Sequence, residues 1–387
     1  MRLDYFLGLA REQGRPGVRD LLLVVGTVSC VTHVVQEVAA RAGGVSITHD
    51  YGCLEFPSSL EQTMRTLAAA AAHPNVGAVL VVGLGCEQID ARELARRVQG
   101  KPVQALIVQE EGGSGYAVAA GTRLALRLRQ EMGQPRREPF PVSELAVGVV
   151  CGASDWTTAI ASNPTLGVMA DLIGEQGGTV AMTETSGIPG TERVLAARAR
   201  DETVAADILA LSAYHADQAR RRYGCPIYEV NPSPGNKAGG ISTMVEKGMG
   251  NIEKVGRGTI YGVVDWANYI PGPGVWIMKD SGIGPDVFSV SGLSAGGCQV
   301  VVFTTGRGSP LGGALVPVVK VTGNPDTARA FAQNIDFDAG TVVRGGESLA
   351  QAGRRLHRLV LEVASGRLTR AEELGHREFG IPRPEGE

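Results

Sequence analysis

The chain has 387 residues, 43% of them hydrophobic and 20% charged, which is enough apolar material for a folded core and excludes disorder of the whole chain. At roughly 100–200 residues per domain, this length predicts two or three domains. The formal net charge of −3 excludes nucleic-acid binding by a basic surface, and the 5% of aromatic residues argues against a base-stacking platform.

Short apolar runs rich in Val, Leu and Ile recur along the chain, and helical patterns lie between several of them. Continuous apolar character is typical of strands buried on both faces of a parallel sheet, so the alternation predicts an α/β fold. In chain order we expect strands at residues 21–25, 78–82, 103–108, 145–150, 179–182, 261–264, 274–278, 299–303 and 316–321. We expect helices at residues 34–42, 60–72, 91–99, 117–131, 191–199, 204–223 and 348–364, with a short one from Thr369.

The stretch from residue 133 to 141 holds three prolines and a charge cluster, and it predicts a domain boundary. We expect a first α/β domain over residues 1–135 and a larger one over residues 142–387. The region 230–258 is rich in Gly, Pro, Asn and Ser, and loops of that length are usually functional or mobile. Neither a signal-peptide core nor an apolar run of membrane-spanning length is found, so we expect a cytoplasmic protein that does not enter a membrane.

Three cysteines follow predicted strands or turns of the first unit: Cys30, Cys53 and Cys86. The carboxyl ends of parallel strands gather along one edge, so these thiols could converge there. Three thiolates with one open position would suit a ferrous ion or an iron–sulfur cluster. The alternative is that each cysteine is a small buried hydrophobe behind a glycine turn. His49 stands close to this group, because it precedes Cys53 by four residues.

The second unit repeats this arrangement of polar residues around strands. Cys151 and Asp155 follow the strand at 145–150, and Glu184 follows the strand at 179–182. Asp155 and Glu184 are candidate metal ligands or bases, with helix N-capping as the alternative. Cys298 leads into a further strand, which is followed by an arginine between two glycines, Arg307.

Arginine presents a planar fork that matches a carboxylate, so Arg307 and Arg19, which both lie near glycines, are candidate clamps for an acidic substrate. A solvated surface position is the ordinary alternative for such an arginine.

The most distinctive stretch reads Asn-Pro-Ser-Pro-Gly-Asn-Lys-Ala-Gly-Gly and begins at Asn231. Glycines and prolines shape its backbone, while Asn231, Ser233, Asn236 and Lys237 carry polar groups. This combination fits an anionic, polyhydroxylated ligand. The spacing is not that of a phosphate-binding P-loop, and no glycine cluster has the dinucleotide fingerprint, which argues against an NAD-dependent dehydrogenase.

With these motifs the sequence resembles the altronate/galactarate dehydratase family of bacterial sugar-acid hydro-lyases. The matching stretches run through almost the whole chain, at residues 14–19, 27–31, 49–53, 65–67, 73–87, 151–155, 163–167, 231–240 and 303–308. The resemblance implies a dehydratase that needs iron, a first α/β domain that dimerises, and a Rossmann-like second domain in which helices flank a parallel sheet.

The resemblance also implies a partner. Full-length members carry a small β-rich N-terminal SAF module, and this chain begins where that module would have ended. Some members, including sulfolactate sulfo-lyase, are split into small and large subunits, so we expect a separate small SAF-type subunit. The sequence departs from the family pattern at Val150, Ala153 and Asn251, and the family often has a cysteine at the last of these. Val150 and Asn251 put the standard hexonate substrates in doubt.

The predicted reaction is elimination of water from a sugar acid or small hydroxy acid to give a 2-keto acid. Lys237 or His49 is the predicted acid or base, and Arg307 and Arg19 the carboxylate clamps. The other predicted substrate contacts are Asn231, Ser233, Asn236 and Asp155, and the predicted iron ligands are drawn from Cys30, Cys53, Cys86, Cys151, Glu184 and Cys298. The alternatives are a sulfo-lyase that releases sulfite and a non-catalytic subunit that binds a sugar acid.

Overall fold

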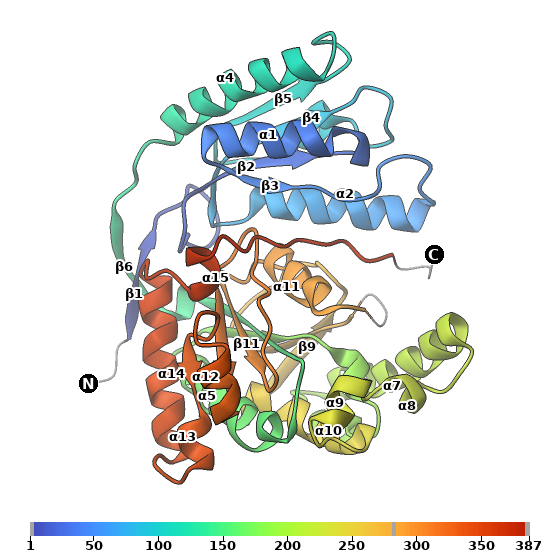
Figure 1. Ribbon diagram of the computed structural model, residues 1–387, viewed down its shortest axis with the longest axis vertical. Helices are drawn as coiled ribbons and strands as arrows, with labels where there is room; N and C mark the ends of the chain where they lie inside the picture. The colour runs from blue at the N-terminus through green and yellow to red at the C-terminus, as the bar shows by residue number, and fades with distance from the viewer. Residues whose placement is uncertain (1–3, 281–283, 384–387) are drawn as a thin grey trace.

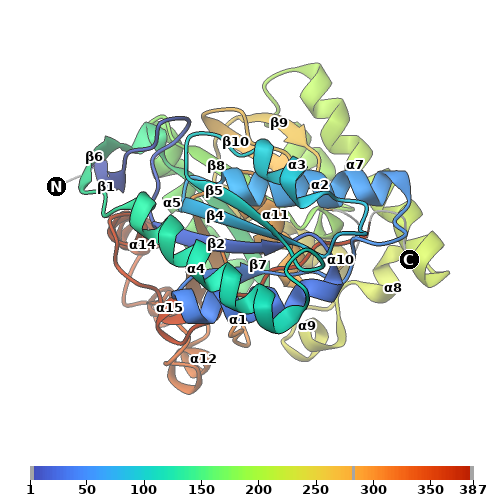
Figure 2. The same cartoon turned by 90° about the horizontal axis from the view of Figure 1, so that it is seen from above.

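The computed structural model describes residues 4–280 and 284–383, which form two α/β units (Figure 1). The first unit is a four-stranded parallel sheet with the strand order β3-β2-β4-β5. Helices α1 and α4 lie side by side over one face, as Figure 2 shows, and α2 and α3 pack on the other. The elements of this unit are β2 (Leu21–Gly26), α1 (Thr32–Ala42), β3 (Val45–Ile47), α2 (Pro57–Ala72), β4 (Val76–Gly83), α3 (Ala91–Arg96), β5 (Val103–Ile107) and α4 (Ser114–Met132).

The second unit is a seven-stranded, all-parallel sheet with the order β13-β12-β11-β7-β8-β10-β9. Its strands are β7 (Ala146–Gly152), β8 (Thr179–Met182), β9 (Ile260–Val264), β10 (Gly274–Met278), β11 (Val300–Thr305), β12 (Val318–Thr322) and β13 (Phe337–Asp338). Its longer helices are α5 (Asn163–Glu175), α7 (Glu202–Tyr223), α11 (Asp286–Ala295) and α14 (Leu349–Ala364). Short helices are α6 (Glu192–Ala196), α12 (Pro325–Ala330), α13 (Gly340–Val343) and α15 (Arg370–Glu373). The predicted Rossmann-like parallel sheet flanked by helices is confirmed.

The two faces of the large sheet are buried differently. Helices α5 and α14 cover one face, where their apolar side chains form a core with those of β7, β8, β11 and β12. The other face carries α11, and its core continues into α2 and α3 of the first unit. Because the strands are apolar on both faces, they read as continuous apolar runs in the sequence.

Two regions differ from the expected organisation. Residues 133–141 are not only a linker, because β6 (Arg137–Pro141) pairs antiparallel with β1 (Tyr5–Leu9). Prolines are tolerated there because an isolated two-stranded ribbon consists of edge strands. The region 230–258 begins where α8 (Ile227–Val230) ends, and it contains α9 (Pro234–Ala238) and α10 (Met244–Ile252). Capping boxes begin α9 and α10, and these helix-start signals were not recognised in the sequence.

The C-terminal segment, residues 376–383, runs between the two units (Figure 1). Arg377 Nη1 donates to Gly44 O at 3.0 Å, and Arg383 Nη1 donates to Glu55 Oε2 at 2.8 Å. The backbone N–H of Gly380 donates to Ser291 Oγ of α11. These contacts tie the second unit to the first. In the described part of the chain, no helix has both the length and the apolar character needed to cross a bilayer.

Candidate active site

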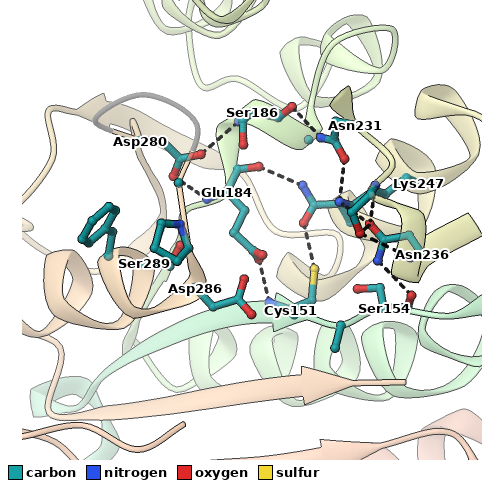
Figure 3. Close-up of a pocket in the computed structure, with 18 of the residues that line it drawn as sticks. Cys151, Ser154, Glu184, Ser186, Asn231, Asn236, Lys247, Asp280, Asp286 and Ser289 are labelled. Carbon is teal, nitrogen blue, oxygen red and sulfur yellow. Dashed lines mark hydrogen bonds between the residues drawn. The ribbon is translucent and has the colours of Figure 1, made fainter. Parts of the chain in front are cut away.

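A pocket of about 310 Å³ opens at the carboxyl ends of β7 and β8. The strand order reverses at β7, and such switch points are where α/β sheets bind ligands. The segment after β7 and the turn after β8 form its floor, while α10, the α8–α9 segment and the start of α11 form its walls (Figure 3). Its polar lining consists of Cys151, Ser154, Glu184, Ser186, Asn231, Ser233, Asn236, Lys247, Asn251, Asp280, Asp286 and Ser289.

A buried ion pair lies at the base of the pocket. Lys254, whose side chain is 0% exposed, pairs with Glu184 Oε2 and lies 3.6 Å from Cys151 Sγ. The backbone N–H of Cys151 donates to the same Glu184 oxygen at 2.6 Å. Burial raises the pKa of Cys151 to about 11, and the nearby Glu184 adds to this, so the thiol is protonated at neutral pH. Burial lowers the pKa of Lys254, but attraction to Cys151 once that thiol ionises, and to the Glu184 carboxylate, outweighs burial, so the net pKa of Lys254 is raised.

The backbone of Glu184 has a left-handed conformation, with φ of 63°, which a non-glycine residue adopts only when its surroundings hold it there. Asp280 supplies that restraint. Its Oδ1 accepts from Thr183 Oγ1 at 2.6 Å and from the Glu184 N–H at 2.9 Å, and its Oδ2 accepts from the Ser186 N–H at 3.0 Å. Asn251 Nδ2 donates to Glu184 O at 3.2 Å. The turn therefore aims the Glu184 carboxylate into the pocket.

A second carboxyl group of the pocket belongs to Asp286, in the first turn of α11. It lies next to Glu184 in Figure 3. Its pKa is raised to about 7, first by burial and then by repulsion from Glu184, although Lys247 and Lys254 oppose the shift. Gly152 is required at the end of β7, because a Cβ there would clash with the Asp286 carboxyl group. The pair thus combines a carboxylate held by a lysine with a carboxyl group that gains or loses its proton near neutral pH.

The opposite wall presents a lysine among amides. Lys247 Nζ donates to Asn231 Oδ1 at 2.6 Å and to Asn236 Oδ1 at 3.0 Å. The two amide nitrogens donate in turn to backbone carbonyls, Asn231 Nδ2 to Ser186 O at 3.1 Å and Asn236 Nδ2 to Ser154 O at 3.0 Å. The ammonium group is therefore fixed on the pocket wall, where it can bind an anion.

Five predicted site residues line this pocket: Cys151, Glu184, Asn231, Ser233 and Asn236. The predicted lysine, Lys237, instead lies exposed on α9 and outside the pocket lining, and Lys247 of α10 takes the position facing the amides. Arg307 is exposed too, and its Nη1 donates to Gly235 O at 3.0 Å, beside the α9 segment but outside the lining.

Sequence reasoning did not predict Lys247, Lys254, Asp280 or Asp286 as site residues. No motif marks Lys254, Asp280 or Asp286. The sequence signal near Lys247 is the helix cap at Thr243, one turn before it.

Three further predicted residues have other partners. Asp155 is 2% exposed and accepts from the Thr158 N–H at 3.1 Å and from Asn324 Nδ2 at 2.8 Å, so its carboxylate bonds to neighbouring protein groups as the capping alternative expects. Cys298 precedes β11 and is buried at the amino edge of the sheet, opposite to the pocket, where burial raises its pKa to about 12. Arg19 is buried, and Glu372 occupies its guanidinium fork at 2.6 and 2.9 Å, so the fork is not open to a substrate.

The three cysteines of the first unit follow β2, β3 and β4, adjacent strands whose carboxyl ends share one edge, as expected. Hydrogen bonds link their loops: Ser29 N donates to Tyr51 O at 2.8 Å, and Gln88 N to Gly52 O at 3.1 Å. Cys30, Cys53 and Cys86 are exposed, so the buried-hydrophobe alternative is wrong.

The side chains do not, however, form a ready metal site. Among the residues that the structure describes, no three His, Cys, Asp or Glu side chains form a group that could hold a metal ion. His49 is buried, with Nε2 3.2 Å from Gly26 O and Nδ1 accepting from the Tyr51 N–H. Burial lowers the pKa of His49, so its imidazole is neutral and bonded to backbone. The predicted iron ligands therefore do not fit a metal ion in this arrangement.

Comparison with known proteins identifies the family of both α/β units. The sequence models for the D-galactarate/altronate dehydratase C-terminal domain and for the D-galactarate dehydratase/altronate hydrolase second domain match residues 142–385 and 8–133. The (2R)-sulfolactate sulfo-lyase subunit beta of Chromohalobacter salexigens is 35% identical over 98% of this chain and 97% of its own length. Altronate dehydratase of Bacillus subtilis is 35% identical over 97% of this chain and 77% of its own length.

Galactarate dehydratase (L-threo-forming) of Escherichia coli is 31% identical over 94% of this chain and 73% of its own length. Because the two family models cover both α/β units and these relatives match nearly the whole chain, the chain belongs to the D-galactarate/altronate dehydratase family of lyases.

Proposed function

We propose that this chain eliminates water from a 2,3-dihydroxy acid of the sugar-acid class to give a 2-keto acid. The observation that carries the proposal is the neighbouring pair Glu184 and Asp286, which faces Lys247 across one pocket: Glu184 is ion-paired with Lys254, and burial raises the pKa of Asp286 to about 7. Elimination needs one group that accepts a proton and one that donates a proton, and such a pair supplies both at neutral pH.

Each group has a defined role in this mechanism. Lys247 binds the substrate carboxylate and stabilises the negative charge that develops on it when the proton at C2 is removed. The Glu184 carboxylate accepts that proton, while Asp286 gives its own proton to the hydroxyl group leaving C3. The C2–H and C3–O bonds break, a C2–C3 double bond forms and water departs. The resulting enol becomes the 2-keto acid by tautomerisation.

Iron remains a prediction based on the resemblance. Since the described residues hold no ready ligand set, no step of this mechanism runs through a metal. The Chromohalobacter relative is named a subunit beta, and this chain matches 97% of that subunit's length. The name supports the proposal that a separate small subunit completes the enzyme. Homodimerisation through the first domain is a further expectation, which sedimentation of the purified chain would test.

The deciding assay follows 2-keto acid release from a panel of hydroxy acids, with the chain alone and titrated with its candidate small subunit. Glu184→Gln and Asp286→Asn should each lower kcat by at least ~10², the scale of general acid–base groups. Asp326→Asn is the matched control, because that carboxylate is 82% exposed on the surface. Near-normal kcat in both pocket variants would refute the proposal, and a rate independent of added subunit would refute the split enzyme.

Release of sulfite from a sulfolactate-like acid is the second candidate, favoured by the near-complete match to the sulfo-lyase subunit. Removal of the C2 proton is the same in both reactions, but sulfite leaves as a stable anion and needs no proton from Asp286. Asp286→Asn should therefore spare sulfite release and abolish dehydration. A protein that only binds sugar acids would release neither 2-keto acid nor sulfite, and its binding would survive Glu184→Gln and Asp286→Asn.

A further inference from the structure

His215 is a fully buried histidine of α7 that lies behind the Glu184 turn, outside the residues that line the pocket. Its Nε2 lies 2.7 Å from Thr185 Oγ1. Among the described residues, its Nδ1 has no hydrogen-bond partner, although the atom is buried. A buried imidazole that makes one polar contact, directed at an active-site turn, calls for a functional explanation.

The hydrogen bond between His215 and Thr185 can run in either direction, depending on which ring nitrogen carries the proton. In both cases Thr185 Oγ1 also accepts from the Asp280 N–H at 3.0 Å, so the same hydroxyl group joins His215 to Asp280. Burial lowers the pKa of His215 to about 4, against the attraction of Asp280, so the imidazole stays neutral at working pH.

The contact joins α7 to the restraint on Glu184. Thr185 holds the backbone of Asp280, and the Asp280 carboxylate holds the N–H groups of Glu184 and Ser186. His215 is thus the outer end of a chain of hydrogen bonds whose inner end is the left-handed Glu184. Loss of the outer bond frees the Thr185 hydroxyl to rotate and loosens the turn.

We propose that His215 is a positioning residue, which acts through Thr185 and Asp280 to keep the Glu184 carboxylate aimed at the substrate. The proposal rests on the proposed function, because it presumes that Glu184 takes part in the reaction. A misplacement of about 1 Å can cost roughly 10²-fold in rate, which sets the scale of the effect.

The test compares His215→Phe, which keeps an aromatic ring against Tyr214 but loses the hydrogen bond to Thr185, with His215→Gln, whose amide can donate or accept that bond. We expect kcat to fall roughly 10–100-fold in His215→Phe with KM changed less than about threefold, and His215→Gln to recover most of the loss. Hydrogen exchange of the Glu184 and Ser186 amides should quicken at least ~10-fold in His215→Phe, while the amides of α7 keep their rates. His73→Phe is the matched control, since His73 is also buried but bonds to Cys298 O in the core between the units.

A double-mutant cycle separates this proposal from the one on which it rests. In a Glu184→Gln background, His215→Phe should lower kcat no further, because both changes act on the same group. If Glu184→Gln leaves kcat unchanged, the proposed function fails. If Glu184→Gln is slow but His215→Phe has normal kcat and normal exchange of the 184 and 186 amides, the positioning role alone is refuted. The positioning role is also refuted if His215→Phe and His73→Phe lower kcat equally and His215→Phe quickens hydrogen exchange throughout α7.

Discussion

Replacing Asp286 by Asn should stabilise the protein while it removes activity. Asp286 has an ordinary pKa of 3.8, and burial and Glu184 raise it to about 7 in the folded chain. A carboxyl group with a raised pKa binds its proton more tightly in the folded state, so the folded state loses stability as pH rises from about 4 to about 7. Above that range the wild type carries the full penalty, whereas a neutral Asn side chain carries none.

The difference between 3.8 and about 7 corresponds to about 4 kcal/mol, at about 1.4 kcal/mol per tenfold change in the acid constant. Asp286 is half-buried, so solvent screening reduces this value, and we expect about 2 kcal/mol at pH 8. The gain should shrink toward zero only as the pH falls below 3.8, where the wild-type carboxyl group becomes protonated in the unfolded as well as the folded state.

Tryptophan fluorescence during urea unfolding measures the effect in the right place, because Trp156, Trp266 and Trp276 all belong to the second unit. Unfolding midpoints of wild type and Asp286→Asn would be compared at pH 5, 7 and 8 in one buffer series. A variant that is less stable at pH 8, or a difference that does not change with pH, would show that Asp286 is not a destabilised carboxyl group.

Lys247→Met should lower kcat/KM about 10²-fold, because it removes the charge facing the pocket amides. Lys237→Met, on the surface of α9, should keep a kcat/KM near that of the wild type. A larger loss in Lys237→Met than in Lys247→Met in steady-state assays would contradict the assignment of the site. Lys254→Met should destabilise the second unit by about 3 kcal/mol, since it leaves Glu184, 17% exposed, without its buried partner, and an unchanged urea midpoint would disprove this. The family resemblance implies iron, whereas the proposed mechanism uses none, and anaerobic chelation tests the two against each other: loss of activity with recovery on ferrous ion would show that iron is needed, and turnover at full rate by metal-free protein would rule it out.

The α/β class and all nine predicted strands follow from the sequence alone, because most of these strands are buried on both faces and are therefore apolar at nearly every position. The strands that were missed, β1, β3, β6 and β13, are short or lie in the edge ribbon. They bury too few residues for a run to stand out. The helical content of 230–258 was missed for another reason: glycines and prolines dominate its composition, while capping boxes at Ser233 and Thr243 set its structure.

The sequence also located much of the pocket, since Cys151 and Glu184 follow apolar runs that had to be strands. Only the tertiary structure decided which charges meet there. Lys237 and Lys247 both belong to short capped helices. Because α10 packs against the pocket, Lys247 donates hydrogen bonds to Asn231 and Asn236, whereas Lys237 is exposed to solvent. Asp286 lies 135 residues after Cys151 in the chain, and its raised pKa depends on burial and on the approach of Glu184. Proton affinity is set by distance and desolvation, which no spacing along the chain encodes.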